Sequence, residues 1–156
     1  MKKIALFWLV GGLVALAMVL SGCVSLQQQY ANSAEEIVEL INDGEAKELY
    51  QMSRTPFLLD GEIIILDNDV RDLWKTITAQ GAKVKNLVLV EAYPVEDKTY
   101  KRFADTFEVE SYFKNYVSDE GHVVIVETEE FRLFLLMDKN KKGDKKLIGM
   151  KGPVAL

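Results

Sequence analysis

The chain has few of the residues on which covalent or metal-centred chemistry depends. Of its 156 residues, one is cysteine and one is histidine. The lone cysteine, Cys23, cannot form an internal disulfide. With His122 as the single histidine, acid–base chemistry at neutral pH would fall to it or to a perturbed carboxylate, and a metal ion would find only oxygen ligands. The sequence therefore predicts no catalytic, cofactor or metal site.

Positive charge is scarce outside one short segment. The formal net charge is −5, and residues 23–138 carry 11 basic and 23 acidic side chains. Such a surface repels phosphate backbones, so we expect no nucleic-acid partner. Five lysines lie within Lys139–Lys146. A solvated hairpin tip is the favoured interpretation of this cluster, and contact with anionic lipid or an acidic partner is the alternative.

Charge is absent from Ile4–Leu20, and this apolar run follows Lys2 and Lys3. Basic residues followed by an apolar stretch and then by small residues are typical of an export signal. The run is only just long enough to span a bilayer. An uncleaved transmembrane helix is therefore the alternative, in which a cysteine at the end of the run would be accidental.

The next four residues, Leu20-Ser21-Gly22-Cys23, resemble the lipobox of bacterial lipoproteins. The resemblance implies a diacylglycerol on the Cys23 thiol, cleavage between Gly22 and Cys23, and a signal peptide over residues 1–22. Two acyl chains such as palmitate give stable membrane attachment, whereas one gives only marginal binding. Val24 stands where an aspartate would imply retention in the inner membrane. The expected location is the outer membrane facing the periplasm in a Gram-negative cell, or the outer face of the plasma membrane in a single-membraned one.

Cleavage would leave a chain of the right length for one domain with a real core. Residues 23–32, which include three consecutive glutamines, are expected to form a lipidated tether. Ser33 and Glu36 have the spacing of a capping box, which predicts that the domain and its first helix begin at Ser33. We therefore expect a single α+β domain over residues 33–156.

Hydrophobic periodicity predicts the elements of this domain. Asp60-Gly61 between apolar runs indicates a hairpin turn, and Asp67 and Asp69 are expected to cap the clearest helix. The strand ending at Pro94 has apolar residues on both faces, which favours a central position in the sheet. The expected elements are a helix from Ser33 to Asn42–Gly44, a short helix over 46–50 stopped by Pro56, a hairpin over 57–66, a helix over 67–81, a strand over 84–92, a helix broken near Glu108 within 99–117 with a strand as the alternative, and strands over 123–126, 131–137 and 145–151.

This order predicts an α+β fold in which helices pack on a curved, mostly antiparallel sheet. It resembles the cone-shaped fold of nuclear-transport-factor-like and cystatin-like domains, in the order of its elements alone. Some enzymes of that fold use an aspartate or an aspartate–histidine pair inside the cone, which would nominate Asp67, Asp69 and Asp72. Their place at a helix start favours capping instead, and His122 is expected to be a solvated turn residue.

Aromatic residues are abundant for so small a domain. A packed core is the favoured interpretation, and an apolar pocket is the functional alternative. Its possible lining residues are Trp74, Tyr93, Phe107, Tyr112 and Phe113. The expected function is a membrane-anchored, non-catalytic binding module of the cell envelope for a small apolar ligand or an envelope protein. The alternatives are a small cone-fold enzyme with an inward carboxylate acting on a small apolar substrate, and a structural lipoprotein of envelope assembly.

Overall fold

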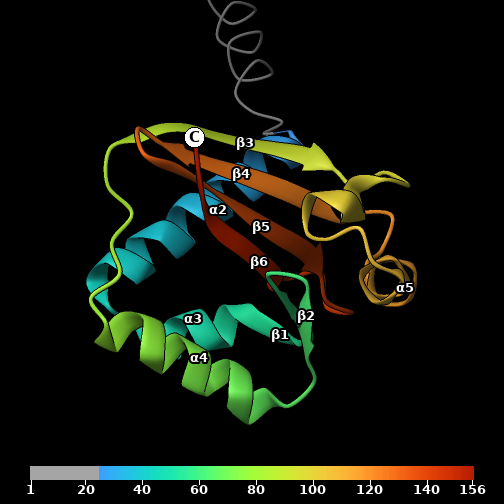
Figure 1. Cartoon of the computed structure of the whole chain (residues 1–156), viewed down its shortest axis with the longest axis horizontal. Helices are drawn as coiled ribbons and strands as arrows, with labels where there is room; N and C mark the ends of the chain where they lie inside the picture. The colour runs from blue at the N-terminus through green and yellow to red at the C-terminus, as the bar shows by residue number, and fades with distance from the viewer. Residues whose placement is uncertain (1–24) are drawn as a thin grey trace, which may run out of the picture.

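A six-stranded mixed sheet with helices packed against it makes up the folded part of the chain (Figure 1). This computed structural model describes residues 25–156, so the export signal, the lipobox and Cys23 lie outside the described residues. The predicted α+β class is confirmed. The elements are α2 (Leu26–Asp43), α3 (Ala46–Met52), β1 (Ser53–Leu59), β2 (Glu62–Ile64), α4 (Asp67–Ala79), β3 (Leu87–Pro94), the 3-10 helix η1 (Thr99–Arg102), α5 (Phe107–Tyr116), β4 (His122–Thr128), β5 (Phe131–Lys139) and β6 (Lys145–Ala155).

The strands follow the order β2-β1-β6-β5-β4-β3. The predicted antiparallel meander of β4, β5 and β6 is confirmed. The hairpin of β1 and β2 is confirmed as well, and its turn residues Asp60 and Gly61 both have positive φ. The parallel pairing of β1 with β6 makes the sheet mixed.

Helix α2 begins earlier than its capping pattern predicts. The Ser25 hydroxyl accepts a hydrogen bond from the Gln28 backbone N–H (3.1 Å), so Ser25 is the N-cap. Ser33 lies inside the helix, where its hydroxyl donates to the Gln29 carbonyl. The tether expected over residues 23–32 is therefore wrong for the part that the structure describes. Tyr30 continues the buried stripe of the helix toward its N-terminus, while the glutamines cover the opposite, exposed face.

Helix α4 and the hairpin beside it confirm the predicted elements but correct their boundaries. Gly81, with φ +70°, closes α4 as expected. The predicted cap is wrong, because Leu66 is the N-cap and Asp67 instead accepts a hydrogen bond from the Thr55 hydroxyl (2.6 Å). Pro56 does not end the preceding helix, since α3 runs directly into β1 and Pro56 lies within that strand.

Strand β3 lies at an edge of the sheet, so its predicted central position is wrong. Leu87, Val88 and Leu89 are 45%, 61% and 41% exposed, and Ala92 is the one buried residue of the strand. Apolar residues on both faces of a strand do not reveal whether other strands pair with both of its edges. Within residues 25–156, β3 pairs with β4 alone and no strand pairs with its other edge.

The ambiguous stretch 99–117 is helical, as favoured. Its break falls at residues 103–106, between η1 and α5, slightly before the predicted position at Glu108. Thr106 begins α5 as its N-cap, because its hydroxyl accepts a hydrogen bond from the Val109 N–H (3.3 Å).

The two faces of the sheet are covered by different helices (Figure 1). Helices α2, α3 and α4 pack on one face, around Trp74 and Leu135. On the other face, η1 and α5 pack around Phe103 and Leu136. Leu135 and Leu136 of β5 point to opposite faces of the sheet, so each contributes to a different core.

Candidate functional site

The structure does not bring the five predicted pocket residues together. Trp74, on α4, is buried in the core between α2, α4 and the sheet. Tyr112 and Phe113, on α5, are buried against the other face of the sheet. Tyr93 and Phe107 are 38% and 78% exposed. The aromatic set is therefore divided between two cores and the surface.

Trp74 nevertheless borders an apolar pocket between the C-terminal half of α4 and the sheet. The pocket has a volume of about 320 Å³, at the small end of the range for ligand sites. Its buried lining is apolar, whereas Gln80 and Lys83 are exposed at its edge. The lining residues are Ile41, Trp74, Ile77, Gln80, Ala82, Lys83, Val84, Phe131, Leu133, Met150, Gly152 and Pro153.

Asn42 holds one wall of this pocket in place. Its side-chain oxygen accepts a hydrogen bond from the Val84 N–H (2.7 Å), and its side-chain amide donates to the Val84 carbonyl (2.9 Å). The Lys83 ammonium donates to the Asn42 carbonyl. The segment after Gly81 is thereby fastened to the end of α2. In the sequence Asn42 is recognisable only as part of a helix stop.

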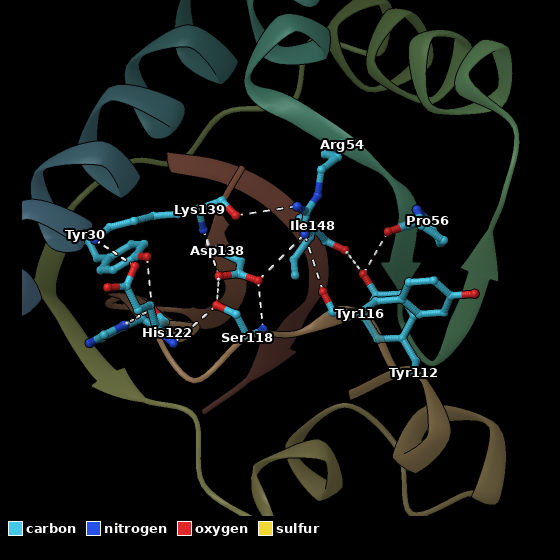
Figure 2. Close-up of polar contacts among 11 residues, drawn as sticks. Tyr30, Arg54, Pro56, Tyr112, Tyr116, Ser118, His122, Asp138, Lys139 and Ile148 are labelled. Carbon is cyan, nitrogen blue, oxygen red and sulfur yellow. Dashed lines mark hydrogen bonds and ion pairs between the residues drawn. The ribbon is translucent and has the colours of Figure 1, made fainter. Parts of the chain in front are cut away.

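A buried polar network lies at the opposite end of α2, where β5 ends (Figure 2). Asp138 is 1% exposed. It accepts hydrogen bonds from the Ser118 N–H (2.9 Å), the Ser118 hydroxyl (2.5 Å) and the Lys139 N–H (2.7 Å). The Arg54 guanidinium lies 3.7 Å from one of its oxygens. Both carboxylate oxygens are thus engaged within the protein, and Asp138 fastens the loop after α5 to the sheet.

Asp138 was not predicted from the sequence as a buried residue, although its position in β5 indicates burial. It follows Leu136 by two residues on the same face of β5, and that face is buried. An acidic residue that continues a buried alternation needs hydrogen-bond partners inside the protein. The partners Ser118 and Arg54 lie too far away in the chain to be recognised by pattern.

His122 is buried, so its prediction as a solvated turn residue is wrong. Its ring stacks on Tyr30 with a centroid distance of 4.3 Å, and its Nδ1 lies 2.8 Å from the Glu120 carbonyl oxygen. The Tyr30 hydroxyl donates to the same carbonyl (3.0 Å; Figure 2). Burial, reinforced by the negative charges of Asp138 and Glu120, raises the pKa of Tyr30 to about 12. The phenol is therefore a neutral hydrogen-bond donor at physiological pH.

The Tyr112 side chain links α5 to the sheet by a hydrogen bond, as Tyr30 links α2 to the Glu120 carbonyl. Its single hydroxyl hydrogen is shared between the carbonyl oxygens of Ile148 (2.6 Å) and Pro56 (2.8 Å), which joins α5 to β6 and β1 (Figure 2). Burial raises the pKa of Tyr112. This hydroxyl stabilises the packing of the helix on the sheet.

The three aspartates nominated for an inward catalytic role all lie exposed on α4. Asp67 bonds to Thr55, and Asp72 pairs with Lys75 at 3.0 Å, a hydrogen bond that lowers the pKa of Asp72. Asp69 lies in the exposed first turn. Because all three are exposed, none of them is the inward carboxylate that a cone-fold enzyme would need.

Two further properties concern residues 25–156 alone. No group of three or more histidine, cysteine, aspartate or glutamate side chains in this part of the chain is arranged to hold a metal ion. Within the same residues, no helix is both long enough and apolar enough to cross a bilayer.

Comparison of the chain with protein-family models, with curated proteins and with solved structures gave no match.

Proposed function

We propose that the chain is an exported lipoprotein of the cell envelope, anchored through Cys23, whose domain binds a small apolar ligand beside Trp74. The lipobox supports the anchor. The pocket carries the proposal for binding, because its inner lining is apolar and its polar groups stand only at the edge. This arrangement is typical of sites that bind an apolar body and orient one polar end.

The edge of the pocket indicates what that polar end is. The Lys83 ammonium donates one hydrogen bond to Asn42 and has further N–H groups to offer. Gln80 adds an amide at the same edge. A carboxylate or another anionic group at one end of a short apolar molecule would match both. We therefore expect a ligand resembling a medium-chain fatty acid in size and polarity.

Photo-crosslinking in the membrane tests this site with the whole protein. Membranes that contain the chain would be exposed to a medium-chain fatty acid bearing a diazirine, and the labelled peptides would be identified by mass spectrometry. We expect labelling at Ile41 and within residues 74–84, 131–133 and 150–153, which contain the lining residues of the pocket. Labelling spread over the surface, or confined to other segments, would contradict the proposal.

A matched pair of variants separates the pocket from nearby surface. Ala82 lines the pocket, so Ala82→Phe should fill it and suppress labelling. Ala79 is exposed at the end of α4 and does not line the pocket, so Ala79→Phe should label as the wild type does. If both variants fold and both label like the wild type, the pocket is not the binding site. The structural alternative, a lipoprotein of envelope assembly, would then be preferred.

A further inference from the structure

The folded domain begins very close to the proposed lipid. Ser25 caps α2, and Cys23 precedes it by two residues, which can span at most about 7 Å. Helix α2 is packed on the sheet from its second turn, where Tyr30 and Ala31 are buried. No long tether separates the domain from Cys23, so the surface around the start of α2 must lie near the bilayer whenever Cys23 carries lipid.

The turn between β5 and β6 belongs to this surface. Lys145, which follows the turn, has its ammonium 5.9 Å from the centroid of the Tyr30 ring. Lys139, at the end of β5, forms an ion pair with Glu120 (2.8 Å), whose carbonyl accepts the Tyr30 hydrogen bond. The lysine-rich segment Lys139–Lys146 is therefore held beside the first turns of α2.

The turn presents two of its five lysines, Lys141 and Lys142, outward, whereas the Lys146 ammonium donates to the Gln51 carbonyl (2.7 Å). The Asn140 side chain accepts hydrogen bonds from the backbone N–H groups of Lys142 and Asp144, and its amide donates to the Asp144 carboxylate (2.9 Å). The one acid of the segment is thereby held by Asn140. Lys141 and Lys142 are exposed and form no ion pair with any other described residue.

The charge of this segment is opposite to that of the remaining chain. Lys139–Lys146 contains five lysines and one acid, whereas residues 23–138 are strongly acidic. An anionic bilayer attracts the former and repels the latter. Because the anchor would keep the turn within reach of the headgroups, even a weak attraction acts at a high effective concentration.

We propose that the β5–β6 turn lies against the headgroups of an anionic phospholipid surface and, together with the lipid on Cys23, holds the domain in one orientation. The inference rests on the lipid anchor of the proposed function. The lysines neutralise lipid charge within a Debye length of the surface, about 8–10 Å at physiological ionic strength. The acidic remainder of the domain is then directed away from the membrane.

Lysine footprinting of the protein as purified from membranes tests the orientation. The protein would be reconstituted into vesicles of phosphatidylcholine, alone or mixed with phosphatidylglycerol, and acetylated with an amine-reactive ester. On the anionic vesicles we expect Lys141 and Lys142 to react about fivefold more slowly than on neutral ones. High salt should remove the protection. Equal reactivity on both kinds of vesicle would overturn the proposal and leave the turn free for an acidic protein.

Charge-reversal variants supply the matched control. In Lys141→Glu, the protection of Lys142 on anionic vesicles should disappear, because the neighbouring charge then repels the headgroups. Lys47 and Lys85 are exposed near the other end of α2, so Lys47→Glu/Lys85→Glu should leave the footprint of the turn unchanged. If the control abolishes protection to the same extent, net charge rather than the turn is responsible, and the proposal fails.

Flotation of the same vesicles separates this proposal from the anchor. Protein that leaves neutral vesicles during flotation has no lipid anchor, and both proposals then fail. Protein that floats with neutral vesicles but shows no protected lysines on anionic ones retains its anchor, and only the orientation is then wrong.

Discussion

At the scale of single residues, the buried carboxylate of Asp138 contributes to the stability of the folded domain. Replacement by alanine leaves the N–H groups of Ser118 and Lys139 without their acceptor. Hydrogen bonds to a charged group contribute more than neutral ones, so we expect Asp138→Ala to lower the free energy of unfolding by about 3 kcal/mol. Chemical denaturation of the purified protein, followed by circular dichroism, measures this loss.

A nearby acid provides the control for that change. Asp119 lies in the same loop but is exposed. Exposed substitutions away from special contacts change stability by no more than about 0.5 kcal/mol, which is the range expected for Asp119→Ala. Similar losses for the two variants would mean that the network around Asp138 contributes nothing specific.

Tyr30 gives a second prediction at this scale, in its dependence on pH. Its phenol has a pKa of about 12 in the folded protein, against an ordinary value of 10.0. Between these values the unfolded chain holds fewer protons than the folded one, so the free energy of unfolding falls as pH rises. Below pH 10 the contribution of the neutral phenol is fully present.

The variant Tyr30→Phe isolates this effect, because it cannot ionise while Tyr112 still can. Unfolding free energies measured between pH 10 and pH 12 should fall more steeply for the wild type than for Tyr30→Phe. Parallel curves for the two proteins would show that Tyr30 ionises as readily in the folded state as in the unfolded one.

At the scale of elements, two serines distinguish the observed start of α2 from the one that the capping box indicates. Ser25 caps the helix, so Ser25→Ala should destabilise the protein by about 1 kcal/mol. Ser33 bonds back to Gln29 inside the helix, so Ser33→Ala should have an effect below about 0.5 kcal/mol. Denaturation experiments on both variants measure which serine contributes more to stability. A larger loss of stability for Ser33→Ala would mean that the helix begins at Ser33, as the capping box predicts.

The edge position of β3 leads to a second prediction at this scale. Val88 is 61% exposed, whereas Val126 on the neighbouring β4 is fully buried. We expect Val126→Ala to cost about 2 kcal/mol, from lost burial and the cavity it leaves, and Val88→Ala to cost no more than about 0.5 kcal/mol. Equal costs in denaturation experiments would mean that Val88 is as well packed as Val126.

Elements defined by local patterns could be predicted, and those defined by distant partners could not. The Asp60-Gly61 turn and the apolar stripe of α4 are complete within a few residues. The edge position of β3 depends on which strands pair. The burial of His122 depends on Tyr30, far away in the sequence. In the candidate site, Trp74 could be predicted as a pocket residue from its side chain alone. Asn42, which holds the pocket wall, could not, because its partner Val84 is distant in the sequence.

At the scale of the whole molecule, α2 joins the two proposed functional regions. Ser25, next to the proposed anchor, caps one end, and Ile41 near the other end lines the apolar pocket. Sixteen residues of helix separate them by about 24 Å. With the start of α2 at the bilayer, the pocket lies at the other end of this helix. A ligand would then exchange with the surroundings of the domain rather than directly with the membrane.

The anchor itself is the last prediction, and the location of the whole molecule depends on it. Cys23 is the only cysteine of the chain, so Cys23→Ala removes the only thiol that could accept a diacylglycerol. We expect this variant to lose metabolic labelling with a fatty-acid analogue and to accumulate as a precursor that retains residues 1–22. Ser21→Ala keeps a small residue before the cleavage point and should be labelled and cleaved normally. Undiminished labelling or normal cleavage of Cys23→Ala would show that the chain is not anchored through this residue.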